Sequence, residues 1–121
     1  MKILVIGDDP LARKIVSSVV EKMGHISIQS SNGRHAWETL WDNSDIGLLV
    51  TDMMMPDMDG RELMHIVRGN QAFLELPVII LSGVVDEEEV EDLLKLGHCV
   101  FCRKPVKAEI LRKLINEAAG V

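Results

Sequence analysis

The chain has 121 residues, 47% of them apolar, and a formal net charge of −6. This length and composition suit one domain with its own core, so we expect a single domain over residues 1–121. The acidic balance argues against a nucleic-acid surface, which needs clustered Lys and Arg. The apolar runs are too short for a membrane span or a signal peptide, so we expect a soluble, cytoplasmic protein.

Short apolar runs alternate with segments of helical period along the first half of the chain. Residues 3–6 predict a strand, and residues 11–23 predict a helix that ends at Gly24. Residues 26–28 alternate apolar and polar side chains, which is typical of a strand at a poorly covered edge. The four-residue repeat that indicates the helix consists of Leu11, Ile15, Val19 and Met23.

The middle of the chain continues with a helix, a strand and a second helix. Residues 36–41 predict a short amphipathic helix, residues 46–51 a strand, and residues 60–69 the second helix. Trp37 and Trp41 on the first of these helices could form a platform for a ligand. At helical spacing, core packing is the more common role of such residues, and we favour it.

The last third of the chain repeats the same alternation. Residues 78–81 predict an almost wholly apolar strand. The next helix carries the acidic run of residues 86–92, which we interpret as a solvated face, with Asp86 as its N-cap. Residues 100–103 and 110–118 predict the last strand and the last helix.

Cys99 and Cys102 form a C-x-x-C pair, which is a redox or metal-binding motif in some proteins. Here the pair falls in a predicted strand, where residues three apart point to opposite faces. We therefore interpret both cysteines as small core residues.

Polar residues stand at the predicted carboxyl ends of the strands. Continuous apolar strands that alternate with helices indicate a parallel sheet covered on both faces. In such a sheet, ligands bind beyond the carboxyl ends of the strands. The residues at these ends are Asp8 and Asp9 after the first strand, Asp52 after the third, Ser82 after the fourth and Lys104 after the fifth.

This set of side chains suits phosphoryl transfer onto an aspartate. Carboxylates gathered at one edge repel one another, by about 4 kcal/mol for two unit charges about 4 Å apart. Either one of them protonates or a cation neutralises the group. Oxygen ligands beside phosphate favour Mg²⁺ as that cation. A lysine can bind a carboxylate and then a phosphoryl oxygen, and a hydroxyl can donate to another such oxygen.

The sequence resembles the receiver domain of two-component response regulators over essentially its whole length. The motifs that carry the resemblance are Asp8-Asp9, the segment TDMMMPDMDG at residues 51–60, Leu81-Ser82-Gly83 and Lys104-Pro105. The resemblance implies an α/β fold of the flavodoxin-like type, with a doubly wound, five-stranded parallel sheet in the order 2-1-3-4-5. Gly7 departs from the pattern, because an acid sometimes stands at that position.

The resemblance also implies a role for each strand-end residue. Asp52 accepts the phosphoryl group, and Ser82 and Lys104 contact it. The resemblance further implies that Asp9 binds Mg²⁺ directly, that Asp8 binds it mostly through water, and that the backbone carbonyl of Met54 supplies a further ligand.

The same resemblance implies a conformational switch and two positions that tune the lifetime of the aspartyl phosphate. Ser82 and Phe101 move together on activation, and the Lys104-Pro105 bond is typically cis. Met54 and Val84 stand at the two positions that tune the lifetime of the aspartyl phosphate. Both are apolar and cannot orient an attacking water, so we predict slow self-dephosphorylation.

We therefore expect a receiver domain that takes its phosphoryl group from a sensor histidine kinase or a histidine phosphotransfer protein. It then switches an interaction surface toward a downstream protein or an output domain outside this chain, without nucleic acid or membrane as partner. It is expected to assist its own phosphorylation and dephosphorylation rather than to act as an enzyme on other substrates. The alternative is a pseudo-receiver, an interaction module without phosphoryl turnover.

Two enzyme or binding classes fit less well. A phosphatase of the haloacid dehalogenase type needs a second acid where Met54 stands. A nucleotide or flavin binder would be expected to carry a G-x-G-x-x-G motif or a P-loop, and the sequence has neither.

Overall fold

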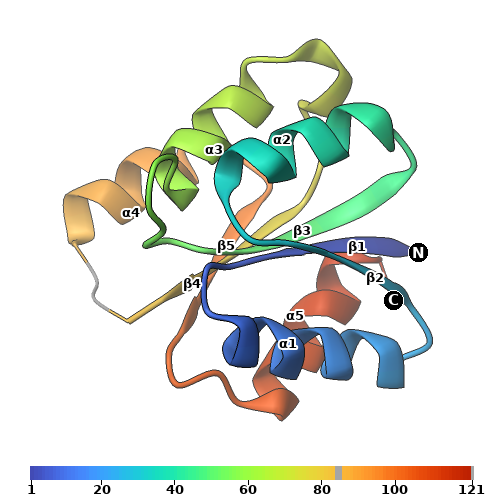
Figure 1. Cartoon of the computed structure of the whole chain (residues 1–121). Coiled ribbons are helices and arrows are strands. Elements are labelled where there is room, and N and C mark those ends of the chain that lie inside the picture. The colour runs from blue at the N-terminus through green and yellow to red at the C-terminus, as the bar shows by residue number, and fades with distance from the viewer. Residues whose placement is uncertain (84–85, 121) are drawn as a thin grey trace.

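A five-stranded parallel sheet forms the centre of the computed structural model, which describes residues 1–83 and 86–120. The strand order is β2-β1-β3-β4-β5, as the resemblance implies. Helices cover both faces of the sheet (Figure 1). The elements are β1 (Lys2–Ile6), α1 (Pro10–Lys22), β2 (Ile26–Ser30), α2 (Gly33–Asp42), β3 (Ile46–Asp52), α3 (Gly60–Arg68), η1 (Gln71–Phe73), β4 (Val78–Ser82), α4 (Glu87–Leu94), β5 (Cys99–Arg103) and α5 (Ala108–Ala118).

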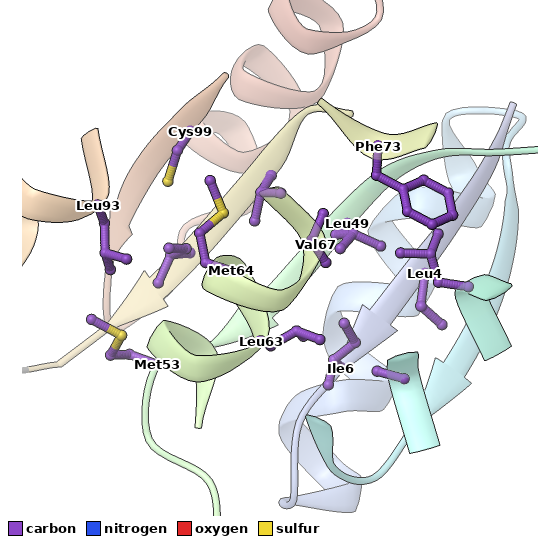
Figure 2. Close-up of a cluster of buried hydrophobic side chains, with 14 of the residues drawn as sticks. Leu4, Ile6, Leu49, Met53, Leu63, Met64, Val67, Phe73, Leu93 and Cys99 are labelled. Carbon is purple, nitrogen blue, oxygen red and sulfur yellow. The ribbon is translucent and has the colours of Figure 1, made fainter. Parts of the chain in front are cut away.

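Alternate residues of the strands supply two cores, one on each face of the sheet. In β1, Leu4 and Ile6 belong to one core, and Ile3 and Val5 belong to the other. Helices α2, α3 and α4 cover the first core, and α1 and α5 cover the second (Figure 1). Figure 2 shows the first core, with strand residues Leu4, Ile6 and Leu49 beside helix residues Leu63, Met64 and Val67.

The edges of the sheet are less covered than its centre. Ile26 on the edge strand β2 is 59% exposed, which confirms the predicted edge position. At the other edge, Val100 on β5 is also exposed. Between the edges, β3 has one partner strand on each side, so its carboxyl end is held in the middle of the sheet.

The buried face of α1 differs from the four-residue repeat in its sequence. Leu11 and Ile15 are exposed, whereas Val16, Val19 and Val20 are buried. A helix has 3.6 residues per turn, so a repeat of four residues drifts by about 40° at each step and moves away from the side that faces the core.

Among the described residues, no helix is both long enough and apolar enough to cross a membrane.

The two tryptophans differ in their packing. Trp37 packs against the first core, and its ring centroid lies 5.8 Å from that of Phe73, which confirms core packing for this residue. Trp41 stacks on the same cluster but is 59% exposed. Phe73 reaches the core from the short 3-10 helix η1, which the sequence pattern did not predict and which Asn70 caps.

The cysteines point to opposite faces, as predicted. Cys99 belongs to the first core and Cys102 to the second, and both are free thiols. Burial raises the pKa of the Cys99 thiol to about 11 and also raises the pKa of Cys102. A high pKa disfavours the thiolate that redox and metal chemistry need, so the core interpretation is confirmed.

Candidate functional site

Asp52 is a buried carboxylate at the carboxyl end of β3. The residue is only 5% exposed, and sheet pairing continues past it because Met53 N donates to Leu81 O at 2.9 Å. A buried charge costs free energy unless a partner offsets it. Lys104 is that partner, since its Nζ lies 2.8 Å from Asp52 Oδ1.

Lys104 reaches Asp52 from the turn that follows β5. The register of β4 and β5 pairs Ser82 with Arg103, and the next N–H, that of Lys104, donates to Ser82 O at 2.9 Å. The Lys104-Pro105 bond is cis, as the resemblance implies. The Lys104 side chain is 37% exposed, so solvent screens the ion pair and makes it weaker than a fully buried one.

Ser82 is the last residue of β4 and is 4% exposed. It lines a small cavity of about 160 Å³ together with the half-buried Phe101. The remaining lining residues are Val90 on α4 and Cys102 and Arg103 on β5. The two predicted switch residues therefore border one space, whereas the predicted tuning residue Val84 lies outside the described residues.

The two acids after β1 have different surroundings. Asp9 caps α1, because its Oδ1 accepts from the backbone N–H of Leu11 at 3.0 Å and of Ala12 at 3.5 Å. Asp8 is exposed, and its carboxylate has no hydrogen-bond or ion-pair partner within residues 1–83 and 86–120. In the same part of the chain, no three Asp, Glu, His or Cys side chains lie close enough together to hold a metal ion.

Two glycines pack directly against Asp52. A Cβ on Gly7 would lie 2.6 Å from Asp52 Oδ2, and a Cβ on Gly60 would lie 2.5 Å from the Asp52 backbone O. Neither glycine has a positive φ, so close approach rather than backbone conformation requires glycine here. The glycine at position 7 therefore does more than remove a negative charge. The Asp52 carboxylate occupies the space that a larger side chain at position 7 would need.

The methionines that follow Asp52 alternate between the interior and the solvent. Met53 and Met55 are 7% and 9% exposed, whereas Met54 is 76% exposed. Met53 lies in the first core (Figure 2). The chain then turns at Asp57, whose φ is 67°, and Asp59 caps α3. This alternation agrees with the predicted placement of methionine side chains on different sides of the loop.

Arg13 is a site residue that sequence reasoning missed. It lines a cavity of about 350 Å³ between α1 and the turn after β5, together with Asp9, Asp52 and Lys104. Its Nη1 donates to Gly7 O at 2.6 Å. The one signal in the sequence is that Arg13 lies in the first turn of the helix that Asp9 caps. Its hydrogen bond to Gly7 depends on how the chain turns after β1.

Comparisons with known proteins show the family and the fold of the chain. A family model described as the response regulator receiver domain matches residues 3–116. The chain is 31% identical to a chemotaxis protein CheY homolog of Campylobacter jejuni, over 99% of this chain and 93% of that protein. It is also 31% identical to the chemotaxis protein CheY1 of Helicobacter pylori, over 99% and 98%. A crystal structure of a response regulator receiver protein from Pseudomonas putida superposes with a TM-score of 0.89 at 28% identity, over 96% of this chain and 95% of that one.

Proposed function

Because the chain belongs to the response regulator receiver domain family, we propose that it accepts a phosphoryl group on Asp52. One observation carries the proposal: the buried Asp52 carboxylate lies at the carboxyl end of the central strand, with Lys104 Nζ at 2.8 Å. Ligands bind at such strand ends in open parallel sheets. A fixed cation beside a buried carboxylate suits a group that becomes more negative when it is phosphorylated.

The proposed step is a nucleophilic displacement at phosphorus. A carboxylate oxygen of Asp52 attacks the phosphorus of a phosphohistidine, so a P–O bond forms while the P–N bond breaks. The imidazole leaves with the electron pair and takes up a proton. Lys104 holds positive charge beside the transferred oxygens, and the Ser82 hydroxyl donates to one of them. Positioning and charge stabilisation are the main terms in phosphoryl transfer, and strand-end residues can supply both.

The oxygen donors at this site fit Mg²⁺, which supplies positive charge to the phosphoryl oxygens when it is bound. Mg²⁺ keeps several waters and needs only one or two carboxylates, so the lack of a three-acid group among the described residues is compatible with it. We assign Asp8, Asp9, Asp52 and the Met54 carbonyl as the residues that would hold it.

The α1 cap leaves Asp9 able to bind the metal ion. Asp9 Oδ1 accepts two backbone N–H groups, and its second carboxylate oxygen is enough for a direct contact with Mg²⁺. We therefore propose that Asp9 binds Mg²⁺ directly and that Asp8 binds it mostly through water.

The proposed partners follow from the reaction. The donor is a sensor histidine kinase or a histidine phosphotransfer protein, and the receiver of the signal is a downstream protein or an output domain outside this chain. This function belongs in the cytoplasm. The protein assists its own phosphorylation and dephosphorylation and acts on no other substrate.

Ser82 and Phe101 are the proposed switch. Phosphorylation shifts a pre-existing equilibrium between two conformations, because the Ser82 hydroxyl binds the phosphoryl group in one of them only. The cavity that Ser82 and Phe101 both line supports this coupling, since a displaced Ser82 leaves space into which the Phe101 ring can turn.

The alternative is a pseudo-receiver that binds partners without phosphoryl turnover. Incubation with acetyl phosphate and Mg²⁺, followed by intact mass measurement, decides between the two. We expect the mass to rise by one phosphoryl group, Asp52→Asn to abolish this gain, and Asp57→Asn, which removes an exposed carboxylate of the same loop, to keep it. No gain in the wild-type protein would favour the pseudo-receiver, and a gain that persists in Asp52→Asn would place the acceptor elsewhere.

A further inference from the structure

The Asp52 carboxylate is held from two sides. Lys104 Nζ lies 2.8 Å from Oδ1. On the other side, the backbone of Gly7 lies so close to the carboxylate that a Cβ there would be 2.6 Å from Oδ2 and 3.4 Å from Cγ. The position of Gly7 therefore limits where the carboxylate can lie.

Gly7 is itself held at both of its backbone groups. Its N–H donates to Ser30 O on β2 at 3.0 Å. Its C=O accepts from Arg13 Nη1 at 2.6 Å, and Arg13 Nε also donates to Gln29 Oε1 on β2 at 3.0 Å. Hydrogen bonds from a guanidinium are stronger than neutral ones, and the planar fork fixes their direction. Arg13 thus ties α1, the turn after β1 and the edge strand β2 together.

We propose that Gly7 and Arg13 position the phosphoryl acceptor: Arg13 fixes the turn after β1, and Gly7 in that turn sets the place of the Asp52 carboxylate. The inference rests on the proposed function of Asp52. Arg13 is a positioning residue, because its side chain donates hydrogen bonds to Gly7 and Gln29 and its effect reaches Asp52 through Gly7. The same bond also fixes Asp8, whose backbone N is joined to the Gly7 carbonyl.

Substitution of Gly7 tests the contact with the acceptor. The backbone of Gly7 does not have a positive φ, so Gly7→Ala acts through its Cβ rather than through backbone strain. We expect the rate of phosphorylation by acetyl phosphate to fall about tenfold or more, since a displacement of about 1 Å at a reacting group can cost that much. Gly47→Ala is the matched control, because the three atoms nearest to its Cβ all belong to the flexible Met1 side chain. A wild-type rate in Gly7→Ala would overturn the proposal.

Substitution of Arg13 tests whether its hydrogen bonds fix the turn after β1. Arg13→Met and Arg13→Lys are expected to lower the rate about threefold to tenfold, because neither keeps both bonds of the fork. Lys14→Met removes the same charge from the next, exposed position of α1 and should keep the wild-type rate. If Lys14→Met loses as much as Arg13→Met, net charge explains the effect and the proposal fails.

Amide NMR spectra of the same variants give a readout that does not need phosphorylation. We expect Arg13→Met and Gly7→Ala to shift the Asp8 and Asp52 resonances and to weaken Mg²⁺ binding in a titration, while the unfolding midpoint moves little. Unshifted Asp8 and Asp52 resonances would overturn the proposal. If the wild-type protein takes up no phosphoryl group, the function proposed for Asp52 fails, and the spectra still decide whether Gly7 and Arg13 set the position of its carboxylate.

Discussion

Lys104 and Met54 show what single residues contribute at this site. Lys104 carries a compact charge on a flexible stem, is partly exposed, and pairs with Asp52 before any phosphoryl group is present. In the proposed function, the Lys104 ammonium moves to a phosphoryl oxygen. Lys104 thus neutralises the Asp52 carboxylate before the reaction and the aspartyl phosphate after it. Met54 adds no charge and is 76% exposed in the loop after Asp52.

Met54 gives a prediction about the lifetime of the phosphorylated state. Its side chain cannot orient water, so Met54→Asn is expected to speed the loss of labelled phosphate about tenfold, less than a full general base provides. The measurement is first-order loss of label from the isolated, phosphorylated protein. Met54→Leu is the apolar control and should leave the rate near that of the wild type. A rate that is unchanged or lower in Met54→Asn, also when combined with Val84→Glu, contradicts the prediction.

At the scale of elements, Asp9 combines a structural role at the start of α1 with the proposed role of a metal ligand. Asp9 satisfies N–H groups of the first turn of α1, where Pro10 follows as a residue suited to the first helical position. Asp8 lies just outside the helix and is exposed. Of these two adjacent acids, only Asp9 also caps the helix, so substitutions at the two positions have different expected effects on stability.

These roles predict different effects of substitutions at Asp8 and Asp9 on stability and on Mg²⁺ affinity. Asp9→Ala removes the cap and is expected to lower the free energy of unfolding by about 1 kcal/mol, whereas Asp9→Asn keeps a capping oxygen and costs little. Asp9→Asn is expected to weaken Mg²⁺ binding at least about tenfold, because Asp9 is the proposed direct ligand, whereas Asp8→Asn should leave stability unchanged and weaken binding less. Urea unfolding and an NMR titration with Mg²⁺ measure the two effects. A larger loss of Mg²⁺ affinity in Asp8→Asn than in Asp9→Asn would contradict this division.

At the scale of the whole molecule, Arg68 joins segments far apart in the sequence. It is 8% exposed at the end of α3, and burial lowers the pKa of its guanidinium, which still stays charged. Its partners are carbonyl groups of the two connections that enter β4 and β5. They are Phe73 O at 2.8 Å, Gly97 O at 3.1 and 3.0 Å, His98 O at 3.0 Å and Leu76 O.

Arg68→Met is expected to lower the free energy of unfolding by about 3 kcal/mol, because it removes five hydrogen bonds from one guanidinium to buried and partly buried carbonyls. Arg61→Met, on the exposed side of the same helix, should cost less than about 0.5 kcal/mol. Urea unfolding of both variants measures the difference. A loss below about 1 kcal/mol in Arg68→Met would show that water or a local shift satisfies these carbonyls.

The sequence predicted those features that depend on local pattern. Apolar runs located the strands, and topology brought Asp52, Ser82 and Lys104 together at their ends, because carboxyl ends of parallel strands share one edge. The exposed Ile15 on α1 was not predictable from its repeat, because the side that is buried depends on the packing of α1 against α5. The contact of Arg13 depends on the fold of a turn, which local pattern does not encode.

The central position of β3 has a mechanical consequence. The proposed acceptor is attached to a strand that is paired on both sides and covered on both faces, so we expect its end to move less than a residue on an edge strand. The proposed switch residues stand on β4 and β5, of which β5 is an edge. We therefore expect a conformational change that starts at the proposed acceptor to displace β4 and β5, while β1 and β2 stay in place.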